Sequence, residues 1–328
     1  MNLKRGVKSL PKVILNRGWL EKSAAFAALL LMIIIFCVIC PPFRTINNVL
    51  TVALQTSIIS FMGAGVTFVI ITGGIDLGIG SVLALSGVVT GLALAAGYPS
   101  PFAILAGLLV GVACGLINGF VITQMKLPPF IATLGMMMIA RGAGLYITNA
   151  APLTVTEPFF DLLGGAIRIQ GLELPVPVPV IIMILVALIF GFILRKTRLG
   201  RYAYAIGSNE EAARLSGLNI TRTKFMVYAI CGLLSAVTGI VLASRLSTAQ
   251  ATAGGSYELD AIAAAVIGGT SLMGGVGTIM GTMIGAFIIG VLRNGLNMMG
   301  VSSFIQMMTI GGVVIISVYI DQLRNRKF

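Results

Sequence analysis

The chain has 328 residues, of which 57% are hydrophobic and only 10% are charged, and its formal net charge is +12. A soluble domain has about 25% charged residues, so this composition excludes a soluble globular protein and predicts an all-α, polytopic membrane protein. The absence of His excludes His-based catalysis and His-ligated metal sites. No phosphate-binding loop of the G-x-x-x-x-G-K-[ST] type occurs, so we expect no nucleotide site, no enzyme activity, no cofactor and no metal in this chain.

The chain begins with a strongly basic stretch before its first apolar run at 24–41. No small-residue cleavage site follows that run, so we expect a basic cytoplasmic tail at 1–23 and a retained first span. Nine further segments have about the length that a bilayer requires. They lie at 49–71, 78–97, 102–123, 130–148, 177–195, 224–244, 258–270, 277–299 and 303–320. We therefore expect one ten-span transmembrane domain at 24–322, followed by a basic cytoplasmic C-terminus at 323–328.

Positive charge is unevenly distributed between the expected spans. With both termini in the cytoplasm, most of the 22 Lys and Arg residues fall on the cytoplasmic side. Cytoplasmic loops are rich in Lys and Arg, so this distribution supports ten spans and explains the net charge without a nucleic-acid partner. An eight-span arrangement stays open if 71–80 and 268–276 are re-entrant segments. The longest outer loop, 149–176, would be either a lid or partner-contact loop or a packed connection.

Asp76 is the one acid in a long apolar region, and it lies in the glycine-rich segment Thr72–Ser81. A carboxylate at membrane depth costs several kcal/mol unless it is paired or hydrated. Asp76 would therefore either stand beside a path or gate through the membrane or cap the N-terminus of the third span. A second glycine-rich segment, Gly268–Gly277, repeats the pattern Gly-Gly-x-[Asp/Ser]-Leu, as an internal repeat with unwound helices would.

Glycines also recur at every fourth position inside two expected spans. They are Gly107, Gly111, Gly115 and Gly119 in one span and Gly277, Gly281 and Gly285 in another. This spacing places small residues along one stripe of a helix and predicts close helix packing rather than a substrate site.

The segment 195–224 is a basic, polar interruption of the apolar sequence. Ser208 and Glu211 form an S-x-x-E capping box, which predicts a short helix that begins near Asn209, and Gly217 is a natural stop. A helix of about eight residues is not stable alone in water, so its apolar residues must lie against something. The helix would either dock into another protein or lie on the anionic membrane surface.

The residues Glu211-Ala212-Ala213-x-x-x-Gly217 resemble the cytoplasmic loop signature of binding-protein-dependent ABC importer permeases. Maltose-type permeases carry a downstream Pro that 218–228 lacks, which points to another branch. Five blocks resemble ribose-type carbohydrate permeases, in the same order along the chain. They are Thr72–Ser81, Thr197–Tyr202, Tyr257–Ile262, Gly268–Leu272 and Asn294–Asn297. The resemblance extends from about Asn47 to Tyr319.

The resemblance implies a type II ABC importer-like permease subunit, multi-pass in the bacterial cytoplasmic (inner) membrane, that moves ribose or a related monosaccharide. It implies four partners: a cytoplasmic ABC ATPase subunit, a periplasmic sugar-binding protein, a second permease copy in a homodimer, and membrane lipid. The residues that would couple to the ATPase are Ser208, Asn209, Glu210, Glu211, Ala212, Ala213, Arg214 and Gly217, framed by Arg198 and Arg201. The alternative is a secondary sugar transporter driven by an ion gradient.

A neutral sugar is bound by hydrogen-bond donors and acceptors rather than by net charge. Asn118, Asn294 and Asn297 are therefore candidates to line its path, although polar contacts between helices would explain them as well. Glu258 and Asp260 would stand in a first helical turn at the outer face. There they would complement the helix dipole or contact basic residues of the binding protein.

Overall fold

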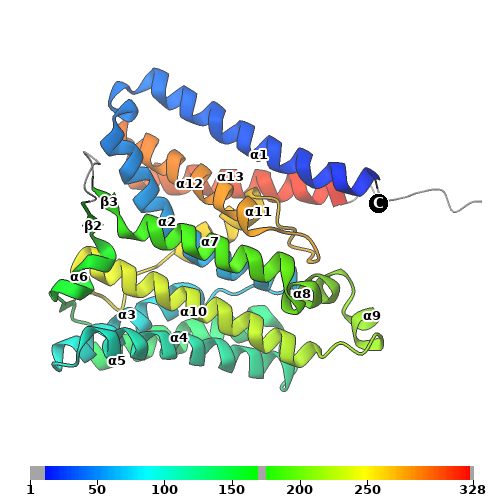
Figure 1. Cartoon of the computed structure of the whole chain (residues 1–328), viewed down its shortest axis with the longest axis horizontal. Helices are drawn as coiled ribbons and strands as arrows, with labels where there is room; N and C mark the ends of the chain where they lie inside the picture. The colour runs from blue at the N-terminus through cyan, green and yellow to red at the C-terminus, as the bar shows by residue number, and fades with distance from the viewer. Residues whose placement is uncertain (1–11, 169–174, 326–328) are drawn as a thin grey trace, which may run out of the picture.

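The computed structural model of the chain describes residues 12–168 and 175–325 (Figure 1). Residues 1–11 of the predicted tail and 326–328 of the predicted C-terminus lie outside the described residues. The helices are α1 Lys12–Ile39, α2 Ile46–Ile71, α3 Ile79–Ala95, α4 Ser100–Thr123, α5 Pro129–Thr148, α6 Pro158–Gly164, α7 Val178–Lys196, α8 Arg198–Ser208, α9 Glu210–Leu215, α10 Ile220–Leu246, α11 Tyr257–Ile267, α12 Ile279–Met298 and α13 Ser303–Asn325, with a 3-10 turn at Pro41–Arg44. The strands are two residues long: β1 Leu153–Thr154 pairs with β4 Thr248–Ala249, and β2 Ala166–Ile167 pairs with β3 Val176–Pro177, both antiparallel.

Each of the ten predicted spans corresponds to one helix of the described chain. Six helices (α2, α4, α5, α7, α10 and α12) are long and apolar enough to cross a membrane, and α1, α3 and α13 contain shorter apolar stretches. The polytopic helical class is thus confirmed, while the number of spans stays a prediction. The eighth predicted span is α11, whose 11 residues rise only about 16 Å, roughly half the hydrocarbon thickness of a bilayer.

The core of the bundle is built around α2 and α10. Most side chains of α2 are buried, including Phe61 and Phe68, as expected for a helix enclosed by others. The predicted glycine stripe on α4 packs against α10. A Cβ atom at Gly111 would collide with the backbone oxygen of Gly232, and a Cβ atom at Gly115 with that of Tyr228. The close-packing prediction for this stripe is therefore confirmed.

The bundle has two distinct ends (Figure 1). At one end, which we call the α9 end, lie α8, α9, the start of α1 and the end of α13. The opposite end, which we call the α6 end, carries α6 and the β2–β3 pair. The described chain therefore begins and finishes at the same end of the bundle, as an even number of spans requires.

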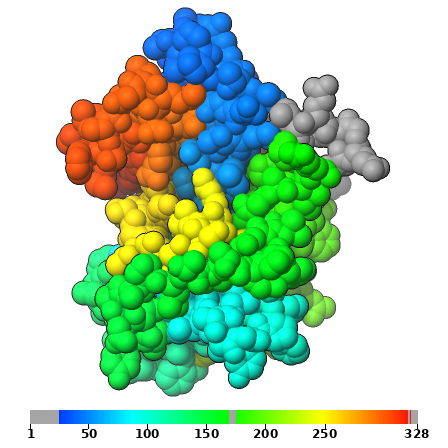
Figure 2. All heavy atoms as spheres, turned by 90° about the vertical axis from the view of Figure 1, so that its left-hand side faces the viewer, coloured from blue at the N-terminus to red at the C-terminus, as the bar shows by residue number. Residues whose placement is uncertain are grey.

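The described part of the connection between α5 and α7, residues 149–168 and 175–177, is packed over the α6 end. Figure 2 shows it as a green band below the yellow residues near position 250. Phe160 is fully buried, and the backbone N–H of Gly164 donates to the Ser244 hydroxyl at 2.7 Å. Glu157 accepts hydrogen bonds from the Ser100 hydroxyl and from the N–H of Phe160, which hold the pKa of Glu157 below its usual value. Of the two alternatives for this loop, these contacts favour the packed connection.

Candidate functional site

Two helices, rather than one, form the polar segment 195–224. Ser208 is the last residue of α8, and α9 is capped by Asn209, whose Oδ1 accepts from the N–H of Ala212 at 2.9 Å. The predicted capping box of Ser208 and Glu211 is therefore wrong by one residue. The reason is that Ser208 keeps helical geometry as part of α8, while Asn209 has the extended backbone (φ −161°, ψ 105°) that a capping residue needs.

Gly217 ends α9 as predicted. Its φ of +80° is left-handed, a conformation that glycine adopts without strain. The N–H of Gly217 donates to the Arg214 carbonyl at 3.0 Å, and the N–H of Leu218 donates to the Ala213 carbonyl at 3.1 Å. These two bonds are those of a Schellman motif, so both ends of this six-residue helix are closed by local hydrogen bonds.

One face of α9 has no packing partner in the described chain. Leu215 is 85% exposed, and Glu211 and Ala212 are exposed beside it, whereas Ala213 is buried. Glu210, whose side chain is 42% exposed, instead forms ion pairs with Arg214 at 3.3 Å and with Lys224 at 2.8 Å. The helix is thus fixed from one side and offers an apolar, acidic surface on the other.

The helix α8 is anchored to the ends of two membrane helices. The Tyr204 hydroxyl donates to the Gly277 carbonyl at 2.6 Å. Gly207 lies so close to the end of α2 that a Cβ atom there would collide with the Ile71 carbonyl, and the N–H of Gly275 donates to that same carbonyl at 2.9 Å. A displacement of α8 would therefore reach α2 and the α11–α12 loop directly.

Arg198 and Arg201 flank this anchor on the surface of α8. Both are exposed, and neither has an ion-pair partner among the described residues. Arg201 donates to the Lys196 carbonyl at 3.2 Å, while Arg198 lines a cavity of about 420 Å³ that also includes Gly217 and Arg222. The structure thus brings all the predicted coupling residues together at the α9 end.

The two glycine-rich segments share one backbone device. Gly73 and Gly269 have φ values of +77° and +90° and end α2 and α11. In both cases the following N–H, that of Gly74 or Thr270, bonds back to the helix, at 3.1 Å and 2.9 Å. Gly73, the first glycine of its Gly-Gly pair, is therefore equivalent to Gly269, the second glycine of its pair. The structural repeat is offset by one residue from the repeat in the sequence pattern.

Asp76 lies buried in the first of these segments. Its Oδ1 accepts from the N–H of Gly78 at 2.8 Å, in an Asx turn directly before α3. The backbone on either side of Asp76 is held by Thr133, whose hydroxyl donates to the Ile75 carbonyl and accepts from the N–H of Leu77, both at 3.2 Å. The N-cap of α3 is Gly78, with no side-chain capping bond, so Asp76 orders the turn before the helix rather than capping α3 itself. A gate role for Asp76 stays a prediction.

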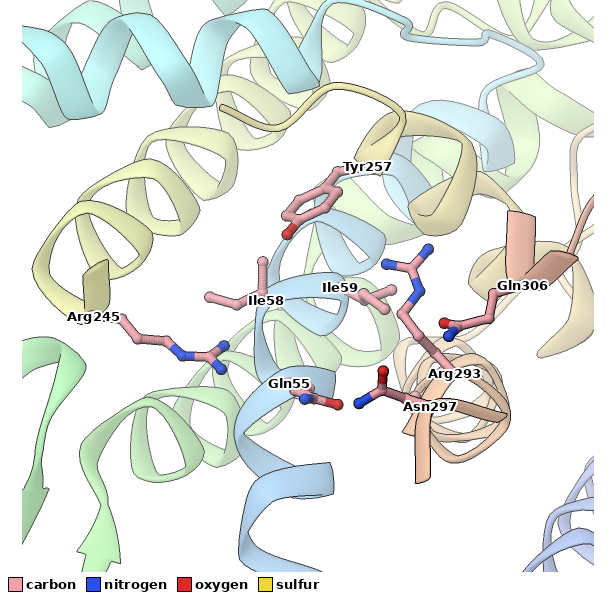
Figure 3. Close-up of a pocket in the computed structure, with 9 residues that line it drawn as sticks. Gln55, Ile58, Ile59, Arg245, Tyr257, Arg293, Asn297 and Gln306 are labelled. Atoms are coloured by element: carbon pink, nitrogen blue, oxygen red, sulfur yellow. The ribbon is translucent and has the colours of Figure 1, made fainter. Parts of the chain in front are cut away.

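A cavity of about 300 Å³ lies among α2, α10, α11, α12 and α13 (Figure 3). Its lining is mostly polar and comes from residues far apart in the sequence. They are Gln55, Ile58, Ile59, Arg245, Tyr257, Gly290, Arg293, Asn297 and Gln306. Figure 3 shows the side chains of Gln55 and Asn297 pointing toward one another across the cavity.

Only one of the three predicted path-lining asparagines lines this cavity. Asn297 does so, whereas Asn118 and Asn294 are buried between helices, and the Asn294 side-chain oxygen has no hydrogen-bond partner among the described residues. Sequence reasoning missed Gln55 and Gln306. The sequence did contain a signal for both, because each is a polar residue inside an expected membrane span.

An ion pair stands behind the wall of this cavity. Asp260 is 5% exposed in its side chain, and its Oδ2 lies 2.9 Å from Nη2 of Arg293. Glu258 and Asp260 do occupy the first turn of α11, but Asp260 is buried rather than displayed at an outer face. A docking role for these two acids stays a prediction.

The segment that leads into α11 is held by a second arginine. Arg141 on α5 donates to the carbonyl of Ala253 at 2.8 Å and also to that of Ala251. These carbonyls lie in the irregular chain between β4 and α11. Arg141 therefore satisfies backbone oxygens that no helix or strand would satisfy there.

Comparison with known proteins agrees with the resemblance of the sequence blocks. A family model described as branched-chain amino acid transport system / permease component matches residues 48–318. The chain is 46% identical to the ribose import permease protein RbsC of Escherichia coli (strain K12), over 95% of this chain and 96% of that protein. It is also 46% identical to RbsC of Bacillus subtilis (strain 168), over 94% and 95%. No solved structure matches the chain.

More distant relatives carry other substrates in their names. The D-allose transport system permease protein AlsC of Escherichia coli (strain K12) is 38% identical, with 93% of each chain covered. A match of this extent, together with the family model, shows the family. The chain belongs to the family of transport-system permease components.

Proposed function

We propose that the chain is the membrane-spanning permease subunit of an ABC importer in the bacterial cytoplasmic membrane, and that it moves ribose or a related monosaccharide into the cell. The observation that carries the proposal is α9. This helix is closed at both ends and fixed by Glu210, yet Leu215 is exposed to solvent. Such a surface is suited to a cleft on a second protein, which we infer to be the ATPase subunit.

The contacts that anchor α8 would transmit movement from α9 to the membrane helices when the partner binds ATP. A partner that moves α9 would also move α8, because only Asn209 separates the two helices. The bond from Tyr204 to Gly277 and the close contact at Gly207 would carry this movement to the ends of α2 and the α11–α12 loop. The two helix ends would shift together, which suits a change in access through the bundle.

The polar cavity is our candidate for part of the sugar path. Gln55, Asn297 and Gln306 offer amide donors and acceptors, and Tyr257 adds an aromatic ring with a hydroxyl. Arg245 and Arg293 could pair with the carboxylate of an amino acid, but its ammonium group would also need a counter-charge, and the described lining holds no Asp or Glu. The lining therefore favours a neutral, hydroxyl-rich substrate over the amino acids in the family description.

We further propose ten membrane crossings, with the α9 end in the cytoplasm. The start of α1, the end of α13 and the cationic segment around α8 lie together at that end (Figure 1), in accordance with the preference of cytoplasmic loops for Lys and Arg. In this arrangement the α6 end faces a periplasmic sugar-binding protein. A second copy of the permease would complete the pathway as a homodimer.

The test is to change the exposed face of α9 without changing its fold. Leu215→Asp and Glu211→Arg should abolish both ATP-driven sugar uptake in proteoliposomes and co-purification of the ATPase subunit, while the melting temperature of the permease stays unchanged. Tyr98→Asp introduces the same charge at an exposed aromatic residue before α4 and should leave co-purification intact. Uptake driven by an ion gradient through the permease alone would instead establish the secondary transporter.

A further inference from the structure

A groove between α7 and α12 is separate from the exposed face of α9 and from the cavity of Figure 3. Its volume is about 540 Å³, and nearly all of its lining is apolar. The lining residues are Met183, Ile184, Ala187, Leu188, Gly191, Phe192, Arg195, Lys196, Thr278, Ile279, Met280, Met283 and Phe287. The groove therefore runs along an exposed, apolar side of α7 and stops at the two cations that end this helix.

The groove is formed by small residues between large ones. Ile184, Leu188 and Phe192 recur every four residues and are exposed on one stripe of α7, with Ala187 and Gly191 beside them. A Cβ atom at Gly191 would meet only the Ile279 Cβ, at 3.9 Å. The floor of the groove at Gly191 is thus open enough to accept a flexible apolar chain.

The two cations at the end of the groove have no counter-charge of their own. Arg195 and Lys196 are both exposed, and neither forms an ion pair with any carboxylate among the described residues. They stand in the last turn of α7, next to α8 at the α9 end of the bundle (Figure 1). An apolar channel that ends at two unpaired cations in the interfacial region is complementary to a molecule with a hydrocarbon chain and an anionic head.

We propose that an anionic phospholipid occupies this groove, with an acyl chain along α7 and α12 and its phosphate on Arg195 and Lys196. A second copy of this chain is a poorer occupant, because its own α9 end is also cationic. Of the acids in α9, Glu210 is already paired with Arg214 and Lys224, and Glu211 belongs to the exposed face that we assign to the ATPase subunit.

The groove lies beside the start of α12, so a bound lipid would affect the stability of the protein. Thr278 and Ile279 line the groove directly after Gly277, whose carbonyl accepts the hydrogen bond from Tyr204 on α8. A bound lipid would therefore steady the start of α12 and, through it, the anchor of α8. We expect binding to stabilise the folded protein, since a ligand that binds only the native state raises its melting temperature.

The experiment uses the full chain, purified in detergent, stripped of lipid and titrated with dioleoylphosphatidylglycerol or dioleoylphosphatidylcholine. Melting temperature and native mass spectrometry report binding. We expect the wild type to prefer phosphatidylglycerol, and Arg195→Gln and Lys196→Gln each to weaken that binding about fivefold, which corresponds to about 1 kcal/mol per cation near an anionic lipid. Gly191→Leu should fill the groove and abolish the bound lipid.

Two matched variants separate the groove from the rest of the surface. Arg222→Gln removes another exposed cation at the same end, and Gly142→Leu adds the same side chain to α5, where a Cβ atom would meet nothing within 4 Å. Both should bind phosphatidylglycerol as the wild type does. Equal binding of the two lipids by the wild type, equal loss in Gly142→Leu and Gly191→Leu, or a change of oligomeric state in the groove variants with lipid binding intact would each overturn the proposal.

Discussion

The α9 segment and the cavity of Figure 3 are built in opposite ways. The helix α9 is specified locally, because its cap at Asn209 and its stop at Gly217 lie within nine residues of one another. The cavity takes its lining from five helices, between Gln55 on α2 and Gln306 on α13. Local hydrogen bonds therefore define α9, the surface that a partner would bind, while long-range packing defines the cavity that a substrate would enter.

The two regions also differ in how well they tolerate amino-acid substitutions. The solvent-facing side of α9 tolerates new side chains, since Leu215 and Glu211 are exposed there. The anchor under α8 and the wall behind the cavity have no free space, because Gly207 lies against the backbone of Ile71 and Gly275 and because Asp260 is itself buried. We therefore expect substitutions on α9 to affect partnership alone, and substitutions in the two closed places to affect stability as well.

The largest effect is expected for Gly207→Ala. In most helices this change is stabilising, by about 1 kcal/mol. At Gly207 the added methyl group would collide with the backbone of Ile71 and Gly275, so we expect a loss of about 3 kcal/mol, the upper range for overpacking. Thermal unfolding in detergent measures it, with Gly142→Ala as the control in open space. An unchanged melting temperature for Gly207→Ala would show that α8 is not anchored as described.

The next effect concerns the ion pair behind the cavity. Asp260→Asn would leave Arg293 without its counter-charge, and we expect a loss of about 2 kcal/mol, below the value for a fully buried pair because the Arg293 side chain is 37% exposed. Arg293→Gln in the same chain should recover part of that loss. A double-mutant cycle from melting curves gives the coupling energy, and additive losses would mean that the two side chains do not interact.

A smaller effect, on transport rather than on stability, is expected inside the cavity. Asn297→Leu should lower kcat/KM for sugar uptake about tenfold, the effect of losing roughly 1.4 kcal/mol of hydrogen bonding to the substrate. Asn294→Leu is the matched change three residues earlier, where the amide is buried outside the cavity, and should leave kcat/KM near the wild-type value. Equal losses in the two variants would place the sugar path elsewhere.

The contrast between the two regions also explains what could be predicted from the sequence. Hydrophobic runs located ten of the helices, four-residue glycine spacing predicted the close packing of α4 that the structure shows against α10, and Gly217 located the end of α9. Each of these signals is confined to one helix or turn. Of the cavity residues, only Asn297 was predicted. Gln55 and Arg245 became neighbours through the packing of α2 against α10, which no local pattern encodes.

The burial of Asp260 was missed for a related reason. Its position in the first turn of α11 was predicted correctly, and the first turn of an expected membrane span is usually placed at the membrane surface. The structure instead leads the chain from β4 through an irregular segment, held by Arg141, before α11 begins. Sequence spacing sets the position of a residue along a helix, but the depth at which that helix starts depends on contacts with α5.

The smallest effect tests the local half of the comparison. Asn209→Ala should destabilise α9 by about 1 kcal/mol, because it removes the acceptor for the N–H of Ala212. Ser208→Ala should change little, since Ser208 is the last residue of α8 and α9 is capped by Asn209. Hydrogen–deuterium exchange of the α9 amides separates the two, with about fivefold faster exchange expected only in Asn209→Ala. The reverse result would restore the capping box of Ser208 and Glu211 and make α8 and α9 parts of one interrupted helix. Equal protection in both variants would mean that α9 is held mainly by Glu210 and its two ion pairs, and that long-range contacts define this helix as they define the cavity.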